Sequence, residues 1–133
     1  MKKLSCISTI AFAFMMLLSV HVDAQKFSGL DKSPLDIAYY KTDRNAPPMV
    51  KVIYSRPQLK GRPLSKLAPN GKVWRTGANE ATEIKFYQDT KFGGKTVEAG
   101  TYSLFTIPGE TEWTIILNKD LDAWGSYSYK ESS

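Results

Sequence analysis

Two neighbouring segments near the C-terminal end constrain the fold of this chain more than any other feature. Residues 102–107 and 113–117 are rich in aromatic and β-branched residues in an alternating pattern, and Pro108 and Gly109 stand between them. A period of two with turn residues in between is typical of a β-hairpin. No segment after residue 24 repeats apolar residues at the 3.6-residue spacing of a helix. The sequence therefore predicts an all-β fold, either a single small β-sandwich or a partial barrel.

The rest of the chain divides into short strands separated by loops rich in proline and glycine. About six strands are expected in all, which would leave one sheet poorly covered, so the domain is expected to lack its last strands. In chain order the prediction is a strand at 35–40, a turn at 42–48, a strand at 49–56, a loop at 57–73 with at most one helical turn at 64–67, a strand at 81–87, a turn at 89–94 and then the hairpin, followed from residue 120 by a tail without a strand.

The N-terminus has the pattern of a cleavable export signal. Lys2 and Lys3 precede an apolar run at 10–20, and Val22-Asp23-Ala24 supplies small residues where a signal peptidase cuts. The run is too short to cross a bilayer, so no transmembrane segment is expected. We predict a signal peptide at 1–24, a flexible leader at 25–34 and one β domain at 35–133, located in the periplasm or cell envelope or released from the cell.

Removal of residues 1–24 would also remove Cys6 and His21, the only cysteine and the only histidine of the chain. The exported domain then has no thiol or imidazole for nucleophilic catalysis, for a disulfide or for zinc. We expect no cofactor and assign no metal site; a metal, if one binds, would be a hard ion held by oxygen ligands. Any specific role must come from carboxylate, hydroxyl, amide, guanidinium, ammonium and aromatic groups.

Charge is distributed unevenly along the exported part. The chain has 18 basic and 13 acidic residues, and loss of Lys2, Lys3 and Asp23 leaves 16 and 12, a net charge of +4. This is too small to indicate a nucleic acid partner. Between Asp43 and Glu80 there is no acidic residue, so this stretch either forms an anion-binding face or pairs with the acidic second half of the chain. Its basic residues are Arg44, Lys51, Arg56, Lys60, Arg62, Lys66, Lys72 and Arg75.

The middle loops contain the residue types of a small binding site. An arginine can bind a carboxylate or phosphate with two hydrogen bonds, and a tryptophan can stack on a sugar ring. The predicted function is a non-enzymatic module that binds a small anionic or saccharide ligand, or a partner protein of the envelope. A purely structural alternative is a buried network in which Glu80 accepts hydrogen bonds from an arginine. The candidate ligand-binding residues are Arg56, Arg62, Trp74, Arg75, Asn79 and Glu80.

Two further sets of residues are candidates for a functional role. Trp124 could form a saccharide platform or belong to the core. Glu80 and Glu83 could form the carboxylate pair of a hydrolase or transferase, but residues three apart on a strand point to opposite faces unless a bulge intervenes. An enzyme therefore remains the alternative function, and no catalytic residue is assigned.

Three long segments, at 54–63, 71–82 and 99–109, together resemble the family catalogued as domain of unknown function 2911, found mostly in exported proteins of Bacteroidetes-type bacteria. The resemblance extends over about residues 32–129 and includes Trp113 to Asn118 and Trp124-Gly125. It implies no established activity, ligand or catalytic residue. Similar proteins continue for several more strands, so this chain is expected to be short at its C-terminus, and a truncated product without function is a third alternative.

Overall fold

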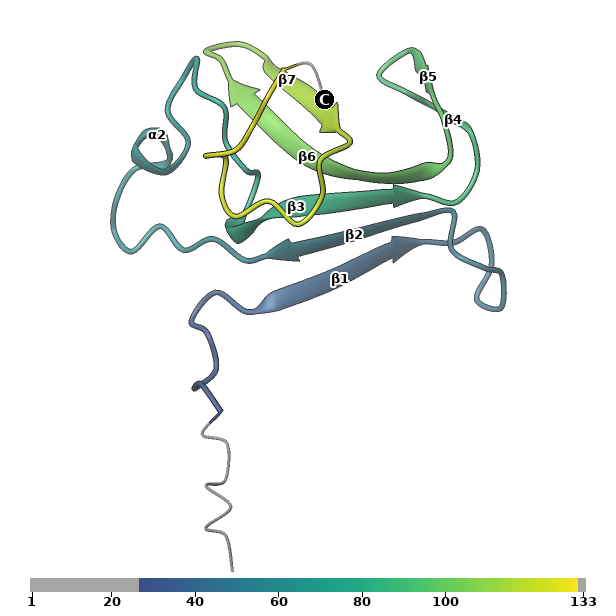
Figure 1. The fold of residues 1–133 in the computed structure, drawn as a ribbon, viewed down its shortest axis with the longest axis horizontal. Helices are drawn as coiled ribbons and strands as arrows, with labels where there is room; N and C mark the ends of the chain where they lie inside the picture. The colour runs from purple at the N-terminus through teal and green to yellow at the C-terminus, as the bar shows by residue number, and fades with distance from the viewer. Residues whose placement is uncertain (1–26, 132–133) are drawn as a thin grey trace, which may run out of the picture.

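The computed structural model describes residues 27–131, which form an antiparallel sheet of five strands in the order β1-β2-β3-β6-β7 and a separate two-stranded hairpin, β4-β5 (Figure 1). The predicted signal peptide lies outside the described residues. No helix within this part has the length and apolar character that crossing a membrane requires. The elements are β1 (Leu35–Tyr40), β2 (Val50–Ser55), α2 (Leu64–Leu67), β3 (Ala78–Phe86), β4 (Thr90–Phe92), β5 (Lys95–Val97), β6 (Gly100–Pro108) and β7 (Trp113–Asn118).

The all-β class predicted from the sequence is confirmed. The strand at 35–40, the helical turn at 64–67 and the final hairpin lie where the alternation and turn residues indicate. The prediction missed one element, because 89–94 was interpreted as a turn only. In the structure Gly93 and Gly94 have φ of +58° and +79° and connect β4 to β5, as in a tight hairpin turn.

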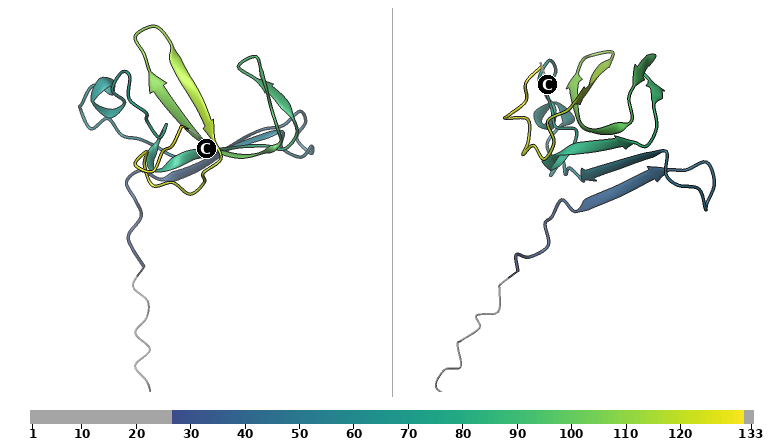
Figure 2. Two further views of the ribbon diagram at one scale, coloured as in Figure 1. Left: turned by 45° about the horizontal axis from the view of Figure 1, so that its top comes forward. Right: turned by 45° about the vertical axis from the view of Figure 1, so that its right-hand side comes forward.

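The β4–β5 hairpin covers one face of the sheet, which we call the hairpin face. Ile84 and Tyr102 lie directly opposite each other in the β3–β6 ladder and form the buried cluster of this face together with Phe86. Phe92 of the hairpin packs on Phe86 at 5.7 Å between ring centroids, and Val97 joins the same cluster. The β4–β5 and β6–β7 hairpins rise on the same side of the β1–β3 part of the sheet (Figure 2). The main apolar core therefore lies between the sheet and a two-stranded second layer.

The C-terminal tail, residues 119–131, covers part of the opposite face, which we call the tail face. Ser103 and Asn118 pair across β6 and β7 and are fully buried. The Ser103 hydroxyl donates to the carbonyl oxygen of Asp120 at 2.7 Å, and the Asn118 amide donates to that of Lys130 at 2.9 Å. Phe105 packs against the Tyr129 ring with 5.2 Å between centroids. The tail is thus held by side-chain contacts to β6 and β7.

Candidate functional site

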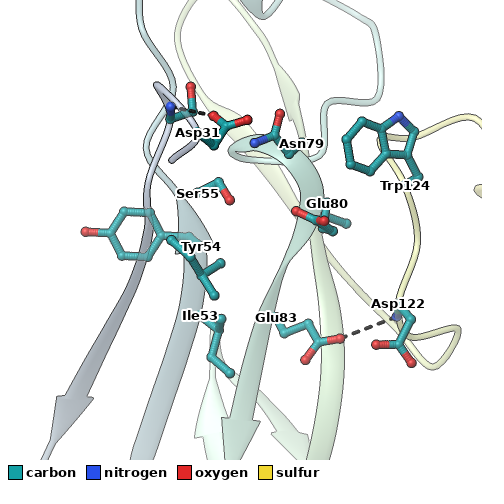
Figure 3. A pocket seen from close by; sticks show the side chains of 12 residues that line it. Asp31, Ile53, Tyr54, Ser55, Asn79, Glu80, Glu83, Asp122 and Trp124 are labelled. Carbon is teal, nitrogen blue, oxygen red and sulfur yellow. Dashed lines mark hydrogen bonds between the residues drawn. The ribbon is translucent and has the colours of Figure 1, made fainter. Parts of the chain in front are cut away.

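A pocket of about 440 Å³ lies on the tail face, where β2 ends and β3 begins (Figure 3). Ile53 and Ser55 of β2 form its floor, the segment before β1 contributes Asp31, and the tail contributes Trp124. This volume lies within the roughly 300–1,000 Å³ range of small-molecule sites. The pocket therefore has the size of a site for a small ligand.

An irregular start of β3 brings two carboxylates into this pocket. Ile53 pairs with Glu83, but Ser55 pairs with Ala78, so one residue of β2 is matched by four residues of β3. Such a bulge breaks the strict alternation of side chains. Glu80 and Glu83, expected on opposite faces of a regular strand, consequently line the same pocket (Figure 3). The bulge is the exception to the alternation of a regular strand, so the argument against this carboxylate pair does not apply here.

Backbone pairing with the tail places Trp124 beside Glu80. The amide of Ala81 donates to the carbonyl oxygen of Ala123 at 2.8 Å, and the amide of Gly125 donates to that of Asn79 at 3.1 Å. These bonds make an isolated antiparallel bridge between Glu80 and Trp124. The Trp124 side chain remains 60% exposed, although its backbone is fixed. The indole is therefore positioned at the pocket without being part of the core.

Position 125 favours glycine over other residues. Its φ is +68°, a left-handed conformation that is unfavourable for other residues. A methyl group added there would also lie 2.8 Å from a ring carbon of Tyr127 and 3.1 Å from the guanidinium of Arg75. The Trp124-Gly125 pair is thus a local sequence signal for the position of the tail.

The charge of the pocket is negative. Its charged lining residues are Asp31, Glu80, Glu83 and Asp122, and no lysine or arginine lines it. Glu83 is partly buried and accepts a hydrogen bond from the backbone amide of Asp122 at 3.4 Å. The Glu80 side chain is exposed. Within residues 27–131 no group of three or more acidic side chains is arranged to hold a metal ion. The pocket thus offers hydrogen-bond acceptors and a negative charge to a ligand.

The structure does not bring all six predicted site residues together. Asn79 and Glu80 line the pocket, but the four others lie outside it. Arg56 forms an ion pair with Asp36 of β1 at 2.6 Å, with side chains 60% and 31% exposed, respectively. Arg62 donates to the carbonyl oxygen of Gln58 within the long loop. Neither of these two arginines therefore lines the pocket.

Trp74 and Arg75 belong to the segment that extends the sheet beside β6. Trp74 pairs with Thr106 through its backbone and meets Trp113 edge-on at 6.0 Å between ring centroids. The Nε atom of the half-buried Arg75 donates to the carbonyl oxygen of Gly77 at 3.3 Å. The structural alternative, a buried pairing of Glu80 with an arginine, is wrong, since Glu80 is exposed and the one ion pair within the described residues joins Arg56 to Asp36.

A second hollow lies on the hairpin face. It is an apolar groove of about 660 Å³ between β7 and the β4–β5 hairpin, with Phe92, Val97, Trp113 and Leu117 in its lining. None of the residues predicted for the site lies in this groove. The pocket on the tail face is therefore the hollow that contains residues predicted from the sequence.

Comparison with known proteins identifies one family. The family model described as "Protein of unknown function (DUF2911)" matches residues 33–133, which is most of the chain. No curated protein and no solved structure was found to match the sequence. The chain belongs to the DUF2911 family.

Proposed function

Starting from membership of this family, we propose that the protein is an exported, non-enzymatic module that binds a saccharide in the pocket between β2, β3 and the tail. The observation that carries the proposal is Trp124, an exposed tryptophan whose backbone is held beside Glu80 by hydrogen bonds of its two neighbours. Export rests on the charged and apolar pattern of residues 1–24, and the place of action is the periplasm or cell envelope.

The chemistry of the lining suits a sugar. The C–H face of a pyranose ring is apolar and gains by covering an indole such as that of Trp124. The hydroxyl groups at its edge donate hydrogen bonds, and the carboxylates of Glu80 and Glu83 accept bonds of the stronger, charge-assisted kind. Asn79 adds a side chain that both donates and accepts. An aromatic platform and polar acceptors therefore face the same pocket (Figure 3).

The sign of the charge selects among saccharides. The charged residues that line the pocket are all carboxylates, which disfavour an anionic ligand, and the nearby Lys51 and Lys85 lie in an adjoining hollow. Arg56, which the sequence predicts as a residue that binds an anionic ligand, instead forms an ion pair with Asp36. The expected ligands are therefore neutral saccharides or saccharides with an amino group, and uronic acids should bind more weakly.

The test is binding of the exported form of the protein to an array of neutral, amino and acidic oligosaccharides, followed by calorimetric titration of the tightest ligand. Trp124→Ala should lower the affinity at least about tenfold, close to 1.4 kcal/mol, as for an aromatic anchor. Trp113→Ala is the matched control, because Trp113 is also exposed but lies in the other groove. An equal loss of saccharide affinity in Trp124→Ala and Trp113→Ala would contradict the proposal, and so would tighter binding of acidic sugars than of neutral ones.

A second candidate function is saccharide hydrolysis, which is favoured by the presence of Glu80 and Glu83 in one pocket. Glycoside hydrolysis generally uses two carboxylates that flank the scissile bond. In that case Glu80→Gln and Glu83→Gln would each abolish turnover while the protein still bound its substrate. A wild-type protein that binds an oligosaccharide and leaves it intact would exclude this candidate for that ligand.

A further inference from the structure

The loop between β2 and β3 contains a cluster of positive charge that the pocket does not use. We call residues 57–72 the basic loop: it has no acidic residue and four basic ones. It projects beyond the end of the sheet around α2 (Figure 1). All four basic side chains are exposed, and none forms an ion pair within the described part of the chain. They are Lys60, Arg62, Lys66 and Lys72.

Backbone hydrogen bonds give the basic loop a defined shape. Residues 59–62 form a tight turn in which the amide of Arg62 donates to the carbonyl oxygen of Leu59 at 3.1 Å. Lys60 and Gly61, with φ of +50° and +78°, occupy the tip of this turn. At the other end the amide of Gly71 donates to the carbonyl oxygen of Pro108 in β6 at 2.8 Å. The loop is therefore attached to the sheet and presents its cations outward.

Apolar side chains are exposed among these cations. Leu59, directly before the turn tip, is 46% exposed, and Leu64, at the start of α2, is 48% exposed. The β6–β7 turn near the end of the loop contains Glu110 and Glu112, and neither forms an ion pair with a cation of the loop. The loop thus combines a net charge of four with two exposed leucines.

We propose that the basic loop docks the protein on an anionic lipid surface. Lysine and arginine side chains near such a surface each strengthen binding by about fivefold. Leucine side chains gain by entering the boundary between headgroups and acyl chains. A hydrated polyanion such as an acidic polysaccharide would satisfy the cations but would bury neither leucine. The combination of cations and exposed leucines therefore favours a lipid surface.

The test is sedimentation of the exported form of the protein with vesicles of phosphatidylcholine alone, or of phosphatidylcholine with about 30% phosphatidylglycerol. Wild-type protein should bind the anionic vesicles and dissociate as salt is added. Lys60→Gln with Lys66→Gln and Lys72→Gln should lower the partition coefficient about a hundredfold, since three cations are lost. These substitutions leave the hydrogen bond from Arg62 to Gln58 in place.

The matched control replaces three exposed lysines elsewhere, with Lys91→Gln, Lys95→Gln and Lys119→Gln. It makes the same change in net charge and should lower binding much less than the loop variant. Equal losses in the two triple variants would overturn the proposal, as would equal binding to the uncharged vesicles. Circular dichroism of all variants should be unchanged, because every substituted side chain is exposed.

A second variant separates a lipid from a polyanion. Leu59→Ser with Leu64→Ser should weaken binding to anionic vesicles severalfold and should leave any binding to dextran sulfate unchanged. If this variant binds vesicles as tightly as the wild type, the leucines do not enter the bilayer, and the proposal fails because nothing then favours a lipid surface over a soluble polyanion. The saccharide pocket is not altered by any of these substitutions, so the outcome is independent of the proposed function.

Discussion

Substitution of Asn118 by aspartate tests how the tail is held on the sheet. Asn118 is 1% exposed. Its Oδ1 atom accepts a hydrogen bond from the amide of Asp120 at 2.8 Å, and its Nδ2 atom donates to the carbonyl oxygen of Lys130 at 2.9 Å. Asn118→Asp keeps the size of the side chain and the first bond. It replaces the donor of the second bond by an acceptor that faces another acceptor.

The expected cost follows from these contacts. Loss of the hydrogen bond to Lys130 costs about 1 kcal/mol, and burial of an uncompensated acceptor and charge adds about 1–3 kcal/mol. We therefore expect the free energy of unfolding at pH 7 to fall by about 2–4 kcal/mol. Because the tail carries Trp124, the variant should also weaken saccharide binding.

The cost should depend on pH in a defined direction. Burial raises the pKa of the introduced carboxyl above its unfolded value of about 3.9. The protonated carboxyl can donate to the carbonyl oxygen of Lys130 as the amide does. The loss of stability should therefore be small below about pH 4, grow as pH rises toward the folded pKa and stay constant above it.

Urea unfolding of the wild type and of Asn118→Asp across this pH range measures the difference directly. Asn70→Asp is the control, because it makes the same chemical change at an exposed position of the basic loop. It should change the unfolding free energy by less than about 0.5 kcal/mol at every pH. The reasoning is refuted if Asn118→Asp is as stable as the wild type at pH 7, or if its deficit persists at low pH.

Three further predictions concern the tail, the core and the surface. Gly125→Ala and Gly71→Ala place an alanine at nearly equal φ, +68° and +70°, and the backbone strain costs about 1 kcal/mol in each case. Position 71 has open space around it, whereas position 125 does not, so Gly125→Ala should lower the thermal stability more than Gly71→Ala. In saccharide titration only Gly125→Ala should weaken binding. Phe105→Ala should lower the unfolding free energy by about 3–5 kcal/mol, because the ring is fully buried under the tail. Asp36→Asn removes an exposed ion pair and should change the unfolding free energy by less than about 1 kcal/mol.

Much of the sheet could be predicted because most of its strands show a local sequence pattern that is typical of a β-strand. The hairpin of β6 and β7 has the alternation and the Pro108-Gly109 turn within one short stretch. The β4–β5 hairpin was missed because each of its strands has only three residues, too few to show a period of two. Its position depends on Phe92 and Val97, which pack on residues from other strands.

The site could be predicted only in part, because its geometry depends on contacts between distant segments. Asn79 and Glu80 are among the polar residues that the sequence predicts for the site, and both line the pocket. Glu83 lines the same pocket as Glu80 because of the bulge in β3, and such a bulge has no clear signal in one sequence. The grouping of Arg56 with the pocket followed its neighbours in the chain, whereas in space it lies beside Asp36 of β1.

The most direct test of the proposed saccharide site is the indole region of a ¹H–¹⁵N spectrum of residues 25–133 during titration with the tightest oligosaccharide of the array. The chain has three tryptophans, so three indole N–H signals are expected. The signal that is lost in Trp124→Phe is that of Trp124. We predict that the Trp124 signal shifts with saturation while the signal of Trp113, in the other groove, stays in place. A Trp124 signal that does not move, or a shift confined to Trp113, would contradict the account.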